Sequence, residues 1–144
     1  MVQQRPGGPW LRGSGRETFR IERTFPVVPV AARLARAAVR ATCAAWCSGS
    51  DACEVLVMAV SELVGNAVRH TCGQEVTVRL SMTPRRVRLE VVDSSPEMPQ
   101  LRHSGLAEEG GRGLWLVSEL ATRWGVEPEP PGKRVWVEIA LPAA

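Results

Sequence analysis

The stretch SELVGNAVRHT, residues 61–71, decides the fold because it combines a helical pattern with an unusual set of polar side chains. Its apolar residues recur at the spacing of a helix that packs on a core: Leu63, Val64, Ala67 and Val68. Glu62 and Asn66 are four residues apart and Arg69 follows three residues later, so all three project from nearly one face of that helix. This face is the first candidate site.

The residue types on this face suit a nucleotide site. The amide oxygen of Asn66 can ligate Mg²⁺, a hard cation that takes oxygen donors, and the carboxylate of Glu62 can accept a proton from a nucleophile. The alternative is a helix whose polar residues simply face water. Two residues at this spacing do not decide between these interpretations, and other motifs are needed.

Length and composition fit one domain. The chain has 144 residues, of which 44% are hydrophobic, enough for a single core. No apolar run approaches the roughly 20 residues that span a bilayer, and the first residues lack the apolar stretch of a signal peptide. We therefore expect a cytoplasmic protein that does not enter a membrane.

The net charge of +3 is carried almost wholly by arginine, since Lys133 is the only lysine. No basic block is interleaved with aromatic residues, so we expect no direct binding to nucleic acid. Arg33, Arg36 and Arg40 recur at helical spacing and form either a docking stripe or a solvated face.

The four cysteines show no CxxC pair. Cys43 and Cys47 lie one helical turn apart and, with Cys53, Cys72 or His70, could hold a metal. Small buried thiols on an alanine-rich helix explain them equally well.

The order of predicted elements indicates an α+β fold, a two-layer sandwich of helices on a mixed, mostly antiparallel sheet. Residues 1–17 are expected to be a flexible tail and residues 18–144 the folded domain. Helices are predicted at 30–47, 52–69 and 113–124, and strands at 18–25, 76–82, 87–91, 125–128 and 135–141. The long segment from 93 to 111 is typical of a functional lid.

Two further motifs carry chemistry. Asp93, at the end of an apolar strand, can accept a hydrogen bond from the exocyclic amine of a base such as adenine, or can simply open the turn before Pro96. In EEGGRGLWLV, Gly111 and Gly113 allow close backbone approach to a phosphate at a helix start, and Arg112 could add a charge. A glycine-rich hinge is the alternative for this segment.

Together these motifs resemble those of a known superfamily. SELVGNAVRH is similar to the N box, the stretch from Asp93 to Pro99 to the first glycine box with its aspartate, and GGRGLWLV to the second glycine box of the GHKL superfamily, the Bergerat-fold or histidine-kinase-like ATPases. Within it the chain is most similar to stand-alone anti-sigma-factor serine/threonine kinases of the RsbW and SpoIIAB type, in particular short actinobacterial members. The resemblance covers about residues 18 to 141.

The resemblance implies that ATP and Mg²⁺ bind between the sheet and the helices under a mobile lid. By position, Asn66 would coordinate Mg²⁺, Glu62 would act as general base, and Asp93 would bind the adenine amino group. Gly111 and Gly113 would contact phosphates at the hinge of the lid.

Other positions follow from, or depart from, the family pattern. Arg69 or His70 would lie near the phosphate end, with Arg112 beside the second glycine box. Ser95 stands where a glycine is usual, and Arg134 is expected at the last-strand position that often carries a threonine near the base. No catalytic role is expected for His103 in the lid.

The resemblance further implies a kinase that phosphorylates a serine or threonine of an anti-anti-sigma partner and sequesters a sigma factor, as a homodimer. The rival hypothesis is a regulatory module that binds ATP weakly or not at all and acts by docking. A sensor histidine kinase fragment is disfavoured because no helix with a phosphoacceptor histidine precedes the ATPase region.

Overall fold

The computed structural model describes residues 19–46, 51–70, 74–95 and 112–142, with the side chains of 112–114 left out of the description. Within these residues the elements run β1 (Phe19–Pro26), α1 (Ala31–Trp46), α2 (Ala52–His70), β2 (Glu75–Thr83), β3 (Arg86–Asp93), α3 (Arg112–Leu120), β4 (Arg123–Glu129) and β5 (Gly132–Ala140). The five strands form one sheet in the order β1-β2-β3-β5-β4. Every pairing in it is antiparallel.

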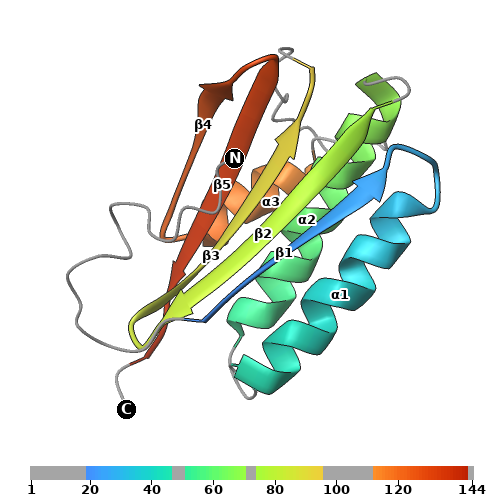
Figure 1. Ribbon diagram of the computed structural model, residues 1–144. Coiled ribbons are helices and arrows are strands. Elements are labelled where there is room, and N and C mark those ends of the chain that lie inside the picture. The colour runs from blue at the N-terminus through green and yellow to red at the C-terminus, as the bar shows by residue number, and fades with distance from the viewer. Residues whose placement is uncertain (1–18, 47–50, 71–73, 96–111, 143–144) are drawn as a thin grey trace.

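The three helices lie together on one face of the sheet, which gives two layers (Figure 1). Helix α2 lies in the middle of the helical layer and packs against α1, α3 and strands β2, β3 and β5. The α+β two-layer fold predicted from the sequence is therefore confirmed, but the sheet predicted to be mixed is antiparallel in all its described pairings. The predicted tail at 1–17 and the predicted lid, apart from its first residues 93–95, fall outside the described residues.

Helix α2 forms the centre of the core because its apolar residues follow the helical period without interruption. Its buried positions step by three residues and one residue in turn along the whole helix: Ala52, Val55, Leu56, Ala59, Val60, Leu63, Val64 and Ala67. Glu62 and Asn66 precede the buried Leu63 and Ala67, so they lie at the border of this buried stripe. Burial of the stripe fixes the rotation of the helix, and so where these two polar side chains lie.

The sheet presents alternate residues to the helices, as the period of two requires. In β3 the buried inner residues include Val87, Leu89 and Val91, and Asp93 follows at the next position of the same parity. In β5 the inner residues Val135, Val137 and Ile139 share their parity with Lys133. Asp93 and Lys133 thus continue the inner face at the end of β3 and the start of β5.

The predicted helix at 113–124 is wrong at its end, because α3 stops at Leu120. The last helical backbone bond runs from the Ala121 N–H to the carbonyl of Val117. The Thr122 N–H instead donates to the carbonyl of Glu138 in β5, and its hydroxyl accepts from the Ala140 N–H. These bonds to β5 draw the chain into the sheet, and β4 begins at Arg123.

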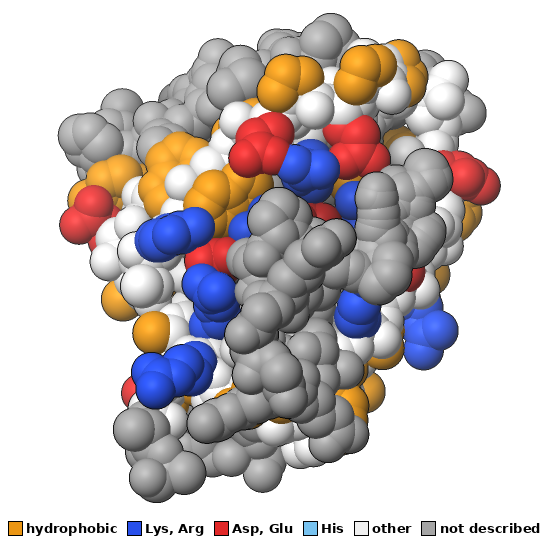
Figure 2. All heavy atoms as spheres, turned by 60° about the vertical axis from the view of Figure 1, so that its left-hand side comes forward, with side chains coloured by type: hydrophobic (Ala, Val, Ile, Leu, Met, Phe, Trp, Pro, Cys, Tyr) orange, Lys and Arg blue, Asp and Glu red, His pale blue; other side chains and the backbone are white. Residues whose placement is uncertain are grey.

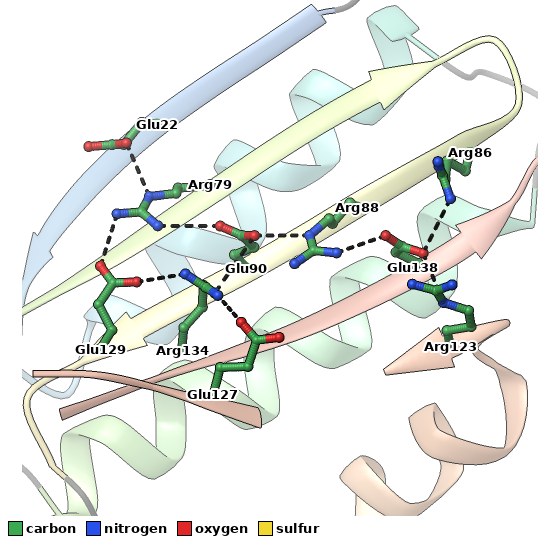
Figure 3. A network of polar contacts seen from close by, with 10 residues as sticks. All are labelled: Glu22, Arg79, Arg86, Arg88, Glu90, Arg123, Glu127, Glu129, Arg134 and Glu138. Atoms are coloured by element: carbon green, nitrogen blue, oxygen red, sulfur yellow. Dashed lines mark hydrogen bonds and ion pairs between the residues drawn. The ribbon is translucent and has the colours of Figure 1, made fainter. Parts of the chain in front are cut away.

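The outer face of the sheet is covered by a network of five arginines and five glutamates (Figure 3). Glu138, with 3% of its side chain exposed, is contacted by the guanidinium groups of Arg88 at 2.8 Å, Arg123 at 3.3 Å and Arg86 at 3.7 Å. Figure 2 shows basic and acidic side chains next to each other on this side of the molecule. The outer face is therefore balanced in charge along the network.

Arg79 joins two parts of that network. It contacts Glu22, Glu90 and Glu129 at 3.2 to 3.3 Å. Burial lowers the pKa of Arg79, but the charges and hydrogen bonds of Glu129 and Glu90 outweigh it, so the pKa is raised overall. Arg79 therefore remains a fixed positive charge on β2 that links this strand to β1, β3 and β4.

No helix in the described part of the chain is long and apolar enough to cross a membrane.

Candidate functional site

Asp93 lies at the end of β3 and is 6% exposed. Its backbone partner in β5 is Lys133, and the two side chains form a buried ion pair. The Lys133 Nζ donates to Asp93 Oδ1 at 3.0 Å, to Asp93 Oδ2 at 3.1 Å and to the carbonyl of Ser95 at 2.9 Å. The Ser95 N–H donates to Asp93 Oδ1 at 2.9 Å, so the aspartate also organises the turn that follows it.

Gly132 allows this approach of β5 to the end of β3. A Cβ atom at position 132 would lie 1.9 Å from the carbonyl oxygen of Asp93 and 2.5 Å from the carbonyl carbon of Ser94. Any side chain there would push the strands apart, since real Cβ contacts are never so short. The glycine therefore sets the position of Lys133 beside Asp93.

Glu62 has the feature expected of a reactive carboxylate. Its Oε1 atom is enclosed by the protein and has no hydrogen-bond partner among the described residues. Buried carboxylate oxygens are normally hydrogen-bonded, and leaving one unpaired is costly. Such an atom is suited to accept a proton or a hydrogen bond from a bound ligand.

Asn66 lies one turn further along α2 and is half-buried. Its Oδ1 atom accepts a hydrogen bond from Arg69 Nη2 at 2.5 Å. The amide oxygen predicted to ligate Mg²⁺ thus accepts a hydrogen bond from a guanidinium group. For Mg²⁺ to bind, Arg69 would have to share this oxygen with the ion or release it. Arg69 is itself exposed, as is His70, the last residue of the helix.

The elements that carry these residues converge at one end of the molecule. The carboxyl ends of α2 and β3 and the start of β5 all lie toward the top of Figure 1, and α2 packs against both strands. Helix α3 begins at Arg112, one residue before the predicted start at 113, and packs against α2. Gly113 lies in the first turn of α3, whereas Gly111 and His103 lie outside the described residues.

Comparison with known proteins decides the family. The family model of the histidine kinase-like ATPase domain matches residues 25–139. The chain belongs to this family. The match spans the three described helices, strands β2, β3 and β4, the end of β1 and all of β5 but its last residue, and it agrees with the superfamily predicted from the three motifs.

Individual relatives add less about activity. The domain is 37% identical over 84 residues to the uncharacterized protein SCO4941 of Streptomyces coelicolor, a match that covers 50% of this chain and 80% of that protein. The structure is similar to that of the RsbU and RsbW domains of Rv1364c from Mycobacterium tuberculosis, with a TM-score of 0.58 and 23% identity. That likeness covers 87% of this chain but 34% of the other, and at this identity it supports the fold alone.

The expected position of Arg134 near the base is wrong. Arg134 lies on the outer face of β5, opposite Val92, where its guanidinium contacts Glu127 and Glu129. Lys133 occupies the inner position beside Asp93 instead. The period of two explains the difference, because neighbouring strand residues point to opposite faces.

Lys133 and Gly132 are the residues of this site that sequence reasoning did not identify. The signal was present, because Lys133 shares its parity with the apolar residues Val135 and Val137 and is the only lysine of the chain.

Two other predictions concern residues away from this end of the sheet. Arg36 is half-buried and donates from Nη1 to the Ser61 hydroxyl at 2.8 Å, so it joins α1 to α2, while Arg33 and Arg40 are exposed. Cys43 is buried in the core, and no group of three or more metal-binding side chains occurs in the described residues. Cys47 and Cys72 fall outside them.

Proposed function

We propose that the protein is an ATP-dependent serine/threonine kinase that phosphorylates an anti-anti-sigma partner and regulates transcription by sequestering a sigma factor. The observation that carries this proposal is the enclosed Oε1 of Glu62, a carboxylate oxygen without a hydrogen-bond partner in the described structure, on the helix that also carries Asn66. Membership in the histidine kinase-like ATPase family supports the nucleotide. The likeness to a structure that contains an RsbW domain is consistent with the partner class.

The donor set fits a nucleotide with bound Mg²⁺. Mg²⁺ is commonly held by one or two protein oxygens together with phosphates and water, so a single amide oxygen from Asn66 is compatible with it. When bound, the ion would neutralise charge on the phosphates. Asp93 would accept a hydrogen bond from the base. The phosphates would be bound by the charges of Arg69 and Arg112 and by the backbone at Gly111 and Gly113.

Glu62 has the central role in the proposed transfer. The hydroxyl of the acceptor serine or threonine attacks the γ-phosphorus of ATP, the bond to the leaving ADP oxygen breaks, and Glu62 takes the proton of the hydroxyl. Catalysis of this kind depends on positioning and charge neutralisation rather than on covalent chemistry by the protein. A cytoplasmic homodimer is the proposed form, following the same resemblance.

A second candidate is a docking module with weak or no ATP binding. Two contacts favour it: Lys133 engages both oxygens of Asp93, and Arg69 engages the amide oxygen of Asn66. In that case the sigma-factor partner would be bound without phosphotransfer.

The two candidates are separated by phosphotransfer. The protein is incubated with γ-labelled ATP, Mg²⁺ and purified anti-anti-sigma proteins of the source organism, and label on serine or threonine is measured. The kinase proposal expects transfer by the parent and none by Glu62→Gln, which should still bind ATP. Tight partner binding without any transfer by the parent would select the docking module.

A further inference from the structure

The buried amine of Lys133 is fully used by its neighbours. An ammonium group has three N–H donors, and its Nζ lies within 3.1 Å of three acceptors, the two oxygens of Asp93 and the carbonyl of Ser95. The pair is also well removed from water, with 10% of the lysine side chain and 5% of the aspartate side chain exposed. Lys133 is therefore a fixed part of the site.

The pair limits what Asp93 can offer to a ligand. A carboxylate has about four lone-pair positions, of which Oδ1 uses two, for the Ser95 N–H and Lys133, and Oδ2 uses one, for Lys133. Among the described residues, one position on Oδ2 is left for a donor. A hydrogen bond to an ionised group is roughly twice as strong as a neutral one, and an adjacent ammonium cancels much of that advantage.

We propose that Lys133 determines base specificity by competing with the exocyclic amine of a bound nucleobase for Asp93. The inference rests on the proposed function, because it requires a nucleotide at this end of the sheet. With the ammonium in place, Asp93 adds little to the affinity for a 6-amino purine. It also takes little from the affinity for a 6-oxo purine, because Lys133 screens the purine oxygen from the carboxylate. The parent protein therefore discriminates weakly between ATP and ITP, which carry an amino group and a carbonyl oxygen respectively at this position.

Removing the ammonium restores the discrimination. In Lys133→Met the aliphatic stem is nearly kept, and Asp93 becomes a charged acceptor that attracts the amine of ATP and repels the oxygen of ITP. A hydrogen bond to a charged group corresponds to a factor of about 10 to 100 in affinity. We expect the ratio of the ITP to the ATP dissociation constant to be below about 5 in the parent and to rise at least about tenfold in the variant.

The test is a set of titrations with MgATP and MgITP on the full chain. Arg134→Met is the matched control, since it removes a cation from the next residue on the opposite face of β5 and should leave the ratio at the parent value. If thermal unfolding shows that Lys133→Met does not fold, Lys133→Gln takes its place, because glutamine is neutral and its amide still donates hydrogen bonds.

The outcomes separate this inference from the proposed function. A ratio that rises in the Lys133 variant alone supports the inference, as does ATP binding that is detectable only in that variant. Equal ratios in parent and variant, or a parent that already prefers ATP by more than about 100-fold, overturn the inference while leaving a nucleotide site. If no variant binds either nucleotide, the proposed nucleotide site fails and the inference fails with it.

Discussion

Replacing Glu62 with glutamine should stabilise the protein while abolishing phosphotransfer. The Oε1 atom of Glu62 is enclosed and lacks a hydrogen-bond partner in the described structure. An unpaired buried acceptor costs about 1 to 3 kcal/mol, and more when it is charged. Glutamine keeps the shape of the side chain but carries no charge, so part of this cost is removed.

The magnitude follows from the geometry. Because Glu62 as a whole is half-buried, the relief applies to one enclosed oxygen, and we expect a gain of about 1 kcal/mol in the free energy of unfolding. For a chain of this length that corresponds to a rise in Tm of about 3 °C. Urea unfolding followed by circular dichroism gives the free energy, and calorimetry gives Tm.

Glu54 supplies the control, because it lies exposed in the first turn of the same helix. Glu54→Gln removes a favourable interaction with the helix dipole and should lower stability by about 0.3 to 1 kcal/mol. If Glu62→Gln also lowers stability by about 1 kcal/mol, the carboxylate of Glu62 has a stabilising partner and the reasoning about an unpaired oxygen is refuted.

Two further predictions concern the sheet and the helix beside it. Gly132→Ala should lower the free energy of unfolding by about 1 to 3 kcal/mol, because its Cβ would lie 1.9 Å from the Asp93 carbonyl oxygen. Gly65→Ala is the control: its Cβ would have its nearest contact at 3.7 Å within a helix, so it should raise the free energy of unfolding by about 0.5 to 1 kcal/mol. Equal effects of the two variants in urea unfolding would refute the close approach at Gly132. Glu138→Gln should lower the free energy of unfolding by about 3 kcal/mol, because it removes the charge of a buried carboxylate that Arg86, Arg88 and Arg123 contact. Glu22→Gln should cost at most about 1 kcal/mol, because the Glu22 side chain is 42% exposed; similar Tm shifts for the two variants would contradict the burial of the network.

Much of the fold follows from periodicity in the sequence. The helix that carries Glu62 and Asn66 is predicted almost to its observed bounds, because its buried stripe follows the helical period through nineteen residues. The strands that become β2 and β3 are likewise predicted from alternation. The end of α3 is not, because Thr122 leaves the helix for bonds to β5, and such tertiary contacts are not visible in a local pattern.

The residues of the candidate site are proposed from sequence motifs, whereas their partners come from the structure. Asp93 at a strand end and Glu62 on the helix face are local features that motifs identify. The ion pair with Lys133 joins residues forty positions apart, and it depends on the antiparallel register of β3 and β5. The bond from Arg69 to Asn66 depends on a rotamer of a long side chain, which sequence spacing permits but does not determine.

The measurement that tests the central claim most directly is a calorimetric titration of the full chain with ATP, in Mg²⁺ and in EDTA, on the parent and on Asn66→Ala. We expect the parent to bind ATP more tightly in Mg²⁺ than in EDTA, and Asn66→Ala to lose that difference while remaining folded. No heat of binding by the parent at millimolar ATP, in a sample that thermal unfolding shows to be folded, would contradict a functional nucleotide site and leave partner docking as the function.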